Sequence, residues 1–235
     1  MIDVSFALIS TAIATAAFVQ GATSVGFALI VAPVLALLAP HLLPTCLLVL
    51  MVPLNAYFVW RERASIDRSG ATWITGGRVV GTFGGLWVLA ASAANLNLIV
   101  GGVTILAAAM SLVVPSFNPN RDAYLAVGVV TGITETATGI GGPPLALVYQ
   151  HRPAATVRAT IALCFLIGEL ISIALLAIAG HPIVSQIGEA VRFTPALVLG
   201  AVFSRVTHRH LNDAALRRFV LLFAVVSGCV LIARG

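Results

Sequence analysis

The chain has 235 residues, of which 60% are hydrophobic and only 9% are charged, so its composition excludes a soluble globular domain. Its formal net charge of +5 comes from basic residues scattered over short connections, so we expect no nucleic acid as a partner. The sequence therefore predicts an integral membrane protein whose surroundings are a lipid bilayer.

Eight apolar segments account for most of the chain, and most are close to the roughly 20 residues that a helix needs to cross hydrocarbon. They are residues 4–38, 42–60, 72–91, 96–114, 123–149, 155–179, 187–203 and 214–233. They lack the alternation of barrel strands, so the predicted fold is an all-α, polytopic transmembrane helical bundle. Short connections leave no room for a soluble domain, and residues 1–235 are predicted to form a single transmembrane transporter domain.

The first segment is too long for a single upright span, and the motif "QGATSVG" interrupts it near its middle. Polar side chains and glycine gather there: Gln20, Gly21, Thr23 and Ser24. Exposed backbone in lipid costs several kcal/mol per unsatisfied group, so this interruption must be buried in protein or line a wet cavity. We expect a broken or re-entrant element.

The fifth segment contains a second interruption, "TETATGIGGPPLALV". Gly139, Gly141 and Gly142 allow the backbone to leave a helical path, and Pro143 suits the first turn of a new helix. The start of a helix offers free N–H groups and a partial positive charge, which favour an anion. Thr136 and Thr138 add hydroxyl donors, so we predict an anion-binding site at this point.

Two halves are predicted, one of about residues 1–115 and one of about 121–235. Gly21 and Pro33 each lie 111 residues before Gly132 and Pro144. If the first and fifth segments both enter and return, every connection that carries arginine falls on one side of the membrane. The halves are then inverted, with both termini outside, which is typical of secondary transporters.

Four ionisable residues inside the segments are candidates for function. Glu169 lies midway along the sixth segment, where a carboxylate either carries a coupling proton or stays a neutral acid. Glu135 adjoins the second interruption and is predicted to be protonated, paired with an arginine, or part of proton coupling. Arg78 and Arg192 lie at similar places in the third and seventh segments, where they frame an anion pathway or extend to the membrane interface.

The glycine-broken segment of each half, the "GIGGPP" of the second half and the later "TPALVLGAVFSRV" resemble the sulfite exporter TauE/SafE family of bacterial membrane permeases. The resemblance implies transport of small sulfur oxyanions, such as sulfite, sulfoacetate and related sulfonates, across the bacterial inner membrane. It marks Gly139, Gly141, Gly142 and Pro143 in the second half. The first half departs from this pattern, with Ala28, Ile30 and Val31 at the places of the three glycines.

These observations favour a secondary transporter that moves a small sulfur-containing anion by alternating access, coupled to H⁺ or Na⁺. An anion channel is the nearest alternative. A membrane-embedded enzyme is disfavoured, because the histidines lie at predicted interfaces, far from a nucleophile such as Ser24. The three cysteines lie singly in apolar segments, so no metal site and no cofactor are expected. Assembly into a homo-oligomer stays open.

Overall fold

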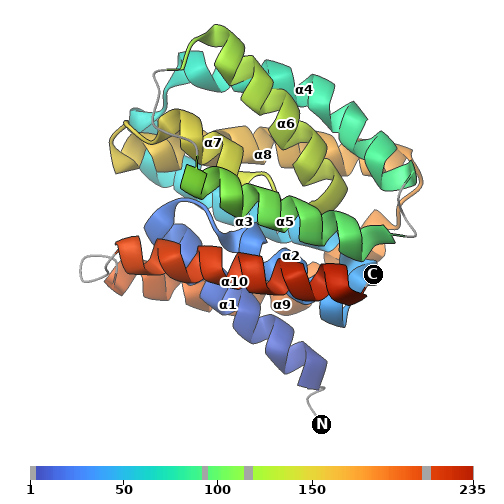
Figure 1. The fold of residues 1–235 in the computed structure, drawn as a ribbon. Helices are drawn as coiled ribbons and strands as arrows, with labels where there is room; N and C mark the ends of the chain where they lie inside the picture. The colour runs from blue at the N-terminus through green and yellow to red at the C-terminus, as the bar shows by residue number, and fades with distance from the viewer. Residues whose placement is uncertain (1–3, 92–94, 114–118, 208–212, 235) are drawn as a thin grey trace.

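The computed structural model describes residues 4–91, 95–113, 119–207 and 213–234. These residues form ten α-helices joined by short connections, two of which are 3-10 turns, and contain no strand (Figure 1). The α-helices are α1 (Val4–Thr23), α2 (Phe27–Leu38), α3 (Thr45–Glu62), α4 (Arg68–Ala91), α5 (Leu96–Val113), α6 (Arg121–Thr138), α7 (Gly142–Tyr149), α8 (Ala154–Ile178), α9 (Ile183–Thr207) and α10 (Asp213–Arg234).

Five of the described helices, α1, α4, α8, α9 and α10, are long and apolar enough to cross a membrane. Many of their large apolar side chains are exposed on the outside of the bundle, as expected of surfaces that face lipid. The predicted all-α transmembrane bundle is therefore confirmed.

The two interruptions expected from the sequence are real helix breaks. The first apolar segment divides into α1 and α2 at Ser24–Gly26, the first break, and the fifth divides into α6 and α7 at Gly139–Gly141, the second break. Each half thus contributes five helices, α1–α5 and α6–α10.

The helix contacts occur in pairs, and each pair is related by exchanging the two halves of the chain. α4 packs on α6 as α9 packs on α1, α4 contacts α8 as α9 contacts α3, and α2 contacts α10 as α7 contacts α5. In Figure 1, α4 and α6 lie on one side, α1, α9 and α10 lie on the other, and α3, α5, α7 and α8 run between them. A twofold relation between the halves would produce this pattern, and their opposite orientation in the membrane stays a prediction.

The register predicted between the halves is wrong by about one helical turn. α2 begins at Phe27 and α7 begins at Gly142, so the breaks lie 115 residues apart and not 111. In this register Ser24 corresponds to Gly139, and both have a positive φ, of 71° and 82°. The residues at the places of Gly139, Gly141 and Gly142 are therefore Ser24, Gly26 and Phe27.

Glycines allow α4 and α6 to pack with their backbones in contact. A Cβ atom on Gly81 of α4 would collide with the carbonyl group of Val129, and one on Gly128 of α6 would collide with that of Ile74. Such small residues at four-residue spacing are a common basis of close helix pairs in membranes. This approach brings Arg78 and Glu135 together, as described below.

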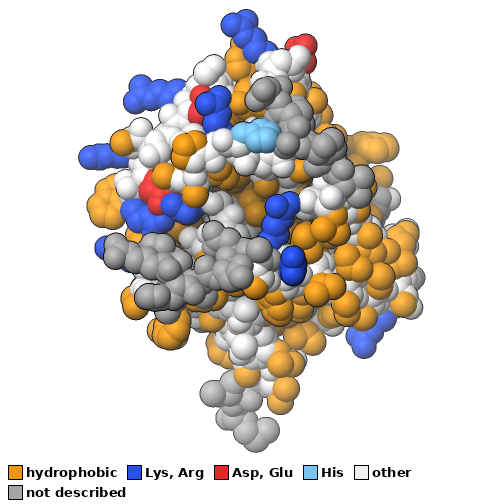
Figure 2. Space-filling model, turned by 60° about the vertical axis from the view of Figure 1, so that its left-hand side comes forward, with side chains coloured by type: hydrophobic (Ala, Val, Ile, Leu, Met, Phe, Trp, Pro, Cys, Tyr) orange, Lys and Arg blue, Asp and Glu red, His pale blue; other side chains and the backbone are white. Residues whose placement is uncertain are grey.

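Arginine side chains gather at one end of the bundle. Arg61, Arg158 and Arg205, from α3, α8 and α9, line a cavity of about 450 Å³. Arg152 and Arg217 line a second cavity, and Figure 2 shows basic side chains spread over this face of the molecule. The grouping agrees with the predicted arginine-rich side, and its placement toward the cytoplasm stays a prediction.

Candidate functional site

The second break has the geometry that the sequence indicated. α6 ends at Thr138, and Gly139 adopts a left-handed conformation while its N–H donates to the carbonyl of Glu135 at 2.7 Å. Gly141 then precedes α7, an eight-residue helix with Pro143 in its first turn. The short helix predicted near Pro143 therefore begins one residue earlier, at Gly142.

Glycine is required at the second break by the side chains around it. A Cβ atom on Gly139 would overlap the side chain of Leu47. On Gly141 it would lie 2.8 Å from Cγ2 of Thr131 and 2.9 Å from Oε2 of Glu135, closer than real Cβ atoms approach. The unwound backbone thus lies directly against the carboxylate of Glu135.

Glu135 forms a completely buried ion pair with Arg78. Nη2 of Arg78 donates to Oε2 of Glu135, and the guanidinium lies over the ring of Phe165 at 5.5 Å from its centroid. The guanidinium also rests against Cα of Gly168 on α8, where a Cβ atom would overlap it. Nε and Nη1 of Arg78 and Oε1 of Glu135 have no hydrogen-bond partner among the described residues.

A second carboxyl group, that of Glu169, lies within electrostatic range of this pair. Glu169 is fully buried, and its Oε1 accepts a hydrogen bond of 2.6 Å from Nδ2 of Asn55. Its Oε2 and the Oδ1 of Asn55 lack partners in the described part of the chain. Asn55, Arg78, Glu135 and Glu169, from α3, α4, α6 and α8, form what we call the polar cluster.

The polar cluster contains buried hydrogen-bonding groups that no described residue satisfies. Buried polar atoms usually have hydrogen-bond partners, and isolated charges inside a membrane protein are costly. Here two guanidinium nitrogens and two carboxyl oxygens are buried without partners among the described residues, beside the start of a helix. Such a concentration of unused donors and acceptors is typical of a binding site.

The hydroxyl groups of the threonines near the second break form hydrogen bonds within the protein. Thr136 shares a hydrogen bond of 2.8 Å with Ser172 of α8. Thr138 donates to the carbonyl of Thr134 at 2.7 Å and accepts from the N–H of Ile140 at 3.2 Å. These hydroxyl groups, predicted as substrate donors, hold α6 on α8 and shape the break.

At the first break the side chains of Gln20 and Thr23 form hydrogen bonds with nearby backbone groups. Oε1 of Gln20 accepts a hydrogen bond of 3.1 Å from the N–H of Phe27, the first residue of α2. Thr23 donates to the carbonyl groups of Val19 and Val25. Gly21 packs against Ser204 of α9, whose side chain a Cβ atom would overlap. Of the residues predicted here, Gly21 lines the cavity of about 450 Å³ described above, and Thr23 and Ser24 line a second sizeable cavity.

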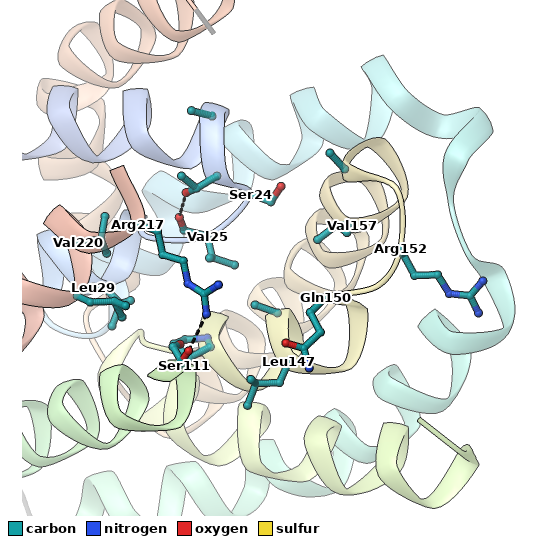
Figure 3. A pocket seen from close by; sticks show the side chains of 16 residues that line it. Ser24, Val25, Leu29, Ser111, Leu147, Gln150, Arg152, Val157, Arg217 and Val220 are labelled. Carbon is teal, nitrogen blue, oxygen red and sulfur yellow. Dashed lines mark hydrogen bonds between the residues drawn. The ribbon is translucent and has the colours of Figure 1, made fainter. Parts of the chain in front are cut away.

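That cavity, which we call the vestibule, has a volume of about 370 Å³ and adjoins both breaks. Its walls include Ser24, Val25, Leu29, Leu147 and Arg217. In Figure 3 the guanidinium of Arg217 extends into it, donating to the carbonyl of Ser111 at 2.6 Å, whereas Arg152 points away.

A cavity of only about 10 Å³ lies between the vestibule and the polar cluster. It shares Val25 and Leu29 with the vestibule and is also lined by Gly142 and Phe165. Phe165, which lines the small cavity, is also the ring beneath Arg78, so the small cavity adjoins both the vestibule and the polar cluster.

The structure does not bring Arg192 to the polar cluster. The side chain of Arg192 is 62% exposed on α9, pairs with Glu189 at 3.0 Å and lies over the ring of Phe6, whereas that of Arg78 is 1% exposed. In the register of 115 residues the counterpart of Arg78 is the buried Phe193, and one residue along a helix turns a side chain by about 100°. Of the two alternatives predicted for Arg192, its exposed position on α9 favours an extension to the membrane interface.

The sequence analysis did not identify several residues of the site. Thr131, Phe165 and Gly168 contact the polar cluster or the second break, Ser172 shares a hydrogen bond with Thr136, and Asn55 belongs to the polar cluster. One signal could have found two of them: Gly168 and Ser172 lie one and three residues from Glu169, so both are within one turn of this predicted residue.

The described residues contain no group of three or more His, Cys, Asp or Glu that could hold a metal ion. No hydrogen bond links Ser24 to His41, His151 or His181, which the structure describes; His208 and His210 lie outside the described residues.

Comparison with known proteins identifies one family. The family model described as sulfite exporter TauE/SafE matches residues 8–231, nearly the whole chain. No curated protein and no solved structure matches the chain.

Proposed function

The chain belongs to the sulfite exporter TauE/SafE family and is a multi-pass membrane transport permease, and from this premise we propose a specific mode of action. The protein is a secondary transporter that moves a small sulfur-containing oxyanion, of the sulfite, sulfonate or sulfoacetate type, across the bacterial inner membrane by alternating access. It carries out no chemical conversion of this substrate.

One observation carries the proposal: Arg78 is buried at the second break with Nε and Nη1 free. A guanidinium is always charged and offers paired N–H donors that match the oxygens of an oxyanion. The N–H groups at the start of α7 add to the attraction for negative charge. A sulfonate or sulfite group satisfies this set of donors with its several oxygens.

The vestibule supports a route to Arg78 from the arginine-rich end of the bundle. An anion entering it meets Arg217 and Ser24, and Val25 and Leu29 separate it from the small cavity beside Phe165. The small cavity is too narrow for any substrate, so passage requires a movement of the two breaks relative to each other. Such a closed step between a vestibule and a buried site is what alternating access demands.

A coupling ion is expected because the polar cluster contains carboxyl groups next to the anion-binding arginine. A proton on Glu135 or Glu169 would offset the charge of the arriving anion. A sodium ion would need several oxygen ligands, and the carboxyl groups here lie beside a guanidinium. We therefore favour H⁺ over Na⁺.

Uptake into proteoliposomes tests the proposal. Purified protein is reconstituted, and uptake of sulfite, methanesulfonate, sulfoacetate and acetate is followed with a pH gradient, with a sodium gradient and with neither. We expect accumulation of at least one sulfur anion, driven by the pH gradient and saturable, in preference to acetate. Empty liposomes and liposomes containing Arg78→Gln are the controls. Absence of uptake of every sulfur anion would refute the substrate class, and unsaturable currents of channel size would identify a channel.

A further inference from the structure

In the described structure, part of Arg78's anion-binding capacity is already occupied by the protein's own carboxylate. We propose that Glu135 is a resident anion that holds Arg78 until a proton neutralises it, so that one proton and one substrate anion always bind together and travel in the same direction. This inference rests on the function proposed above and specifies its coupling.

The contacts of Arg78 support this role of Glu135. Glu135 engages Nη2, while Phe165 and Gly168 pack against the guanidinium and leave Nε and Nη1 without hydrogen-bond partners among the described residues. The same carboxylate lies against Gly141 at the second break, where an anion drawn to the start of α7 would be placed. Substrate and Glu135 therefore compete for one cation and one space.

The groups that face Glu135 define the charge balance. α4 contributes Arg78, α8 contributes Glu169 and Cys164, and α3 contributes the neutral Asn55. α7 contributes glycine backbone at this point, and α5 has no titratable side chain. With Arg78 positive and Glu135 negative, the polar cluster is neutral only when Glu169 holds a proton.

An added anion would leave this buried cluster with an uncompensated negative charge, which is expensive in a medium of low dielectric constant. A proton on Glu135 restores neutrality. The carboxylate becomes a carboxylic acid, Arg78 keeps its protons, and the ion pair with Glu135 is replaced by an ion pair with the substrate. On the other side the anion leaves, the proton dissociates and Glu135 pairs with Arg78 again.

This cycle fixes the charge moved per turnover. A monoanion such as methanesulfonate crosses with one proton and moves no net charge. A dianion such as sulfoacetate crosses with the same single proton and moves one negative charge. Glu169 keeps its proton throughout.

Binding to the wild-type protein gives the first test. Titration calorimetry of methanesulfonate is run over a series of pH values, in pairs of buffers that differ in ionisation enthalpy. We expect proton uptake that rises to one per bound anion, and an affinity that falls about tenfold per pH unit on the alkaline side. Anion binding without proton uptake at any pH would overturn the inference, and this measurement needs no variant.

The variant Glu135→Gln gives the second test, with Glu189→Gln as a matched control at the exposed pair of Arg192. In Glu135→Gln we expect an affinity that no longer changes with pH, exchange of labelled for unlabelled anion, and no accumulation driven by a pH gradient. Glu189→Gln should behave as the wild type. Persistence of pH-driven accumulation in Glu135→Gln would overturn the inference.

The response of uptake to the membrane potential gives the third test. It distinguishes the coupling to one proton from the proposed transport function itself. In wild-type proteoliposomes with a potassium diffusion potential, methanesulfonate uptake should not respond to the potential, whereas sulfoacetate uptake should. An equal response of both anions would refute the fixed single proton while leaving the transport function in place. Failure to transport any sulfur anion would refute the proposed function itself.

Discussion

At the first break Gln20 accepts a hydrogen bond from the backbone of Phe27, whereas at the second break the corresponding residue, Glu135, pairs with Arg78. The two breaks share part of their backbone geometry, since Ser24 and Gly139 both have a positive φ and a new helix starts three residues later, whereas Gly26 has a φ of 126° and Gly141 one of −135°. Their side chains differ in one respect: the first break has a neutral amide that satisfies its own backbone, and the second has a charged pair with unused hydrogen-bonding groups.

This difference shows that two halves with a similar helix arrangement can carry different polar groups at corresponding positions. The partner helices show the same contrast, because α4 presents Arg78 to the second break while α9 places Phe193 at the equivalent point and Arg192 outside. We therefore expect the second break, together with Arg78 of α4, to bind the substrate, and the first break to line the vestibule and to supply the movable wall. Five substitutions, in four comparisons, test this division of roles in order of decreasing effect.

Arg78→Gln and Arg192→Gln contrast the two arginines most strongly. Arg78→Gln should abolish transport and destabilise the protein by about 3–5 kcal/mol, because Glu135 stays buried without its partner. Arg192→Gln should change stability by at most about 1 kcal/mol, since its pair with Glu189 is exposed. Uptake assays and thermal unfolding in detergent measure both effects. The double variant Arg78→Gln/Glu135→Gln should recover stability and not transport, and equal losses in both single variants would remove the proposed asymmetry.

Gly168→Ala displaces the side chain of Arg78 without removing a charged group. A Cβ atom at this place overlaps the guanidinium, which must move away from Phe165, so we expect anion affinity to fall by about tenfold, or about 1.4 kcal/mol. Gly188→Ala on α9 is the control, since its Cβ atom would meet nothing within 4 Å. Calorimetric titration with methanesulfonate compares the two variants. Wild-type affinity in Gly168→Ala would show that the position of Arg78 is irrelevant to binding.

Gln20→Leu removes the side-chain acceptor of the first break. The buried N–H of Phe27 then loses its partner, so the free energy of unfolding should fall by about 1–3 kcal/mol. The pH dependence of anion affinity should stay as in the wild type, because Gln20 does not titrate. Denaturation and binding at several pH values measure the two properties separately. A flattened pH dependence would mean that the first break takes part in proton coupling.

Tyr149→Phe should have the smallest effect. The hydroxyl of Tyr149 donates to Oδ2 of Asp67 at 3.2 Å and holds the end of α7 on the start of α4, while Asp67 keeps its second bond to the N–H of Gly70. Loss of one such bond should cost about 1 kcal/mol, with little change in transport. Thermal unfolding and uptake detect these effects. A large loss of transport at unchanged stability would place the end of α7 in the substrate pathway.

Much of the fold could be predicted from the sequence, because its causes are local. Long apolar runs require helices in lipid, and the glycines and prolines after Thr138 end one helix and start the next. The burial of Glu135 and Glu169 also follows from their places within apolar segments. The register between the halves could not be read in this way, since matched glycines and prolines such as Gly21 and Gly132 arise easily by coincidence.

The sequence by itself determined a helical membrane protein, the positions of both helix breaks and membership in a transporter family, since hydrophobicity, glycine and proline act on their own stretch of chain. Only the tertiary structure decided that Arg78 pairs with Glu135, that Asn55 supports Glu169 and that Arg192 lies outside. These outcomes depend on which side of each helix faces its neighbour and on how closely glycines let α4 approach α6. A shift of one residue along a helix rotates the side chain by about 100°, which is enough to turn a buried charge into an exposed one.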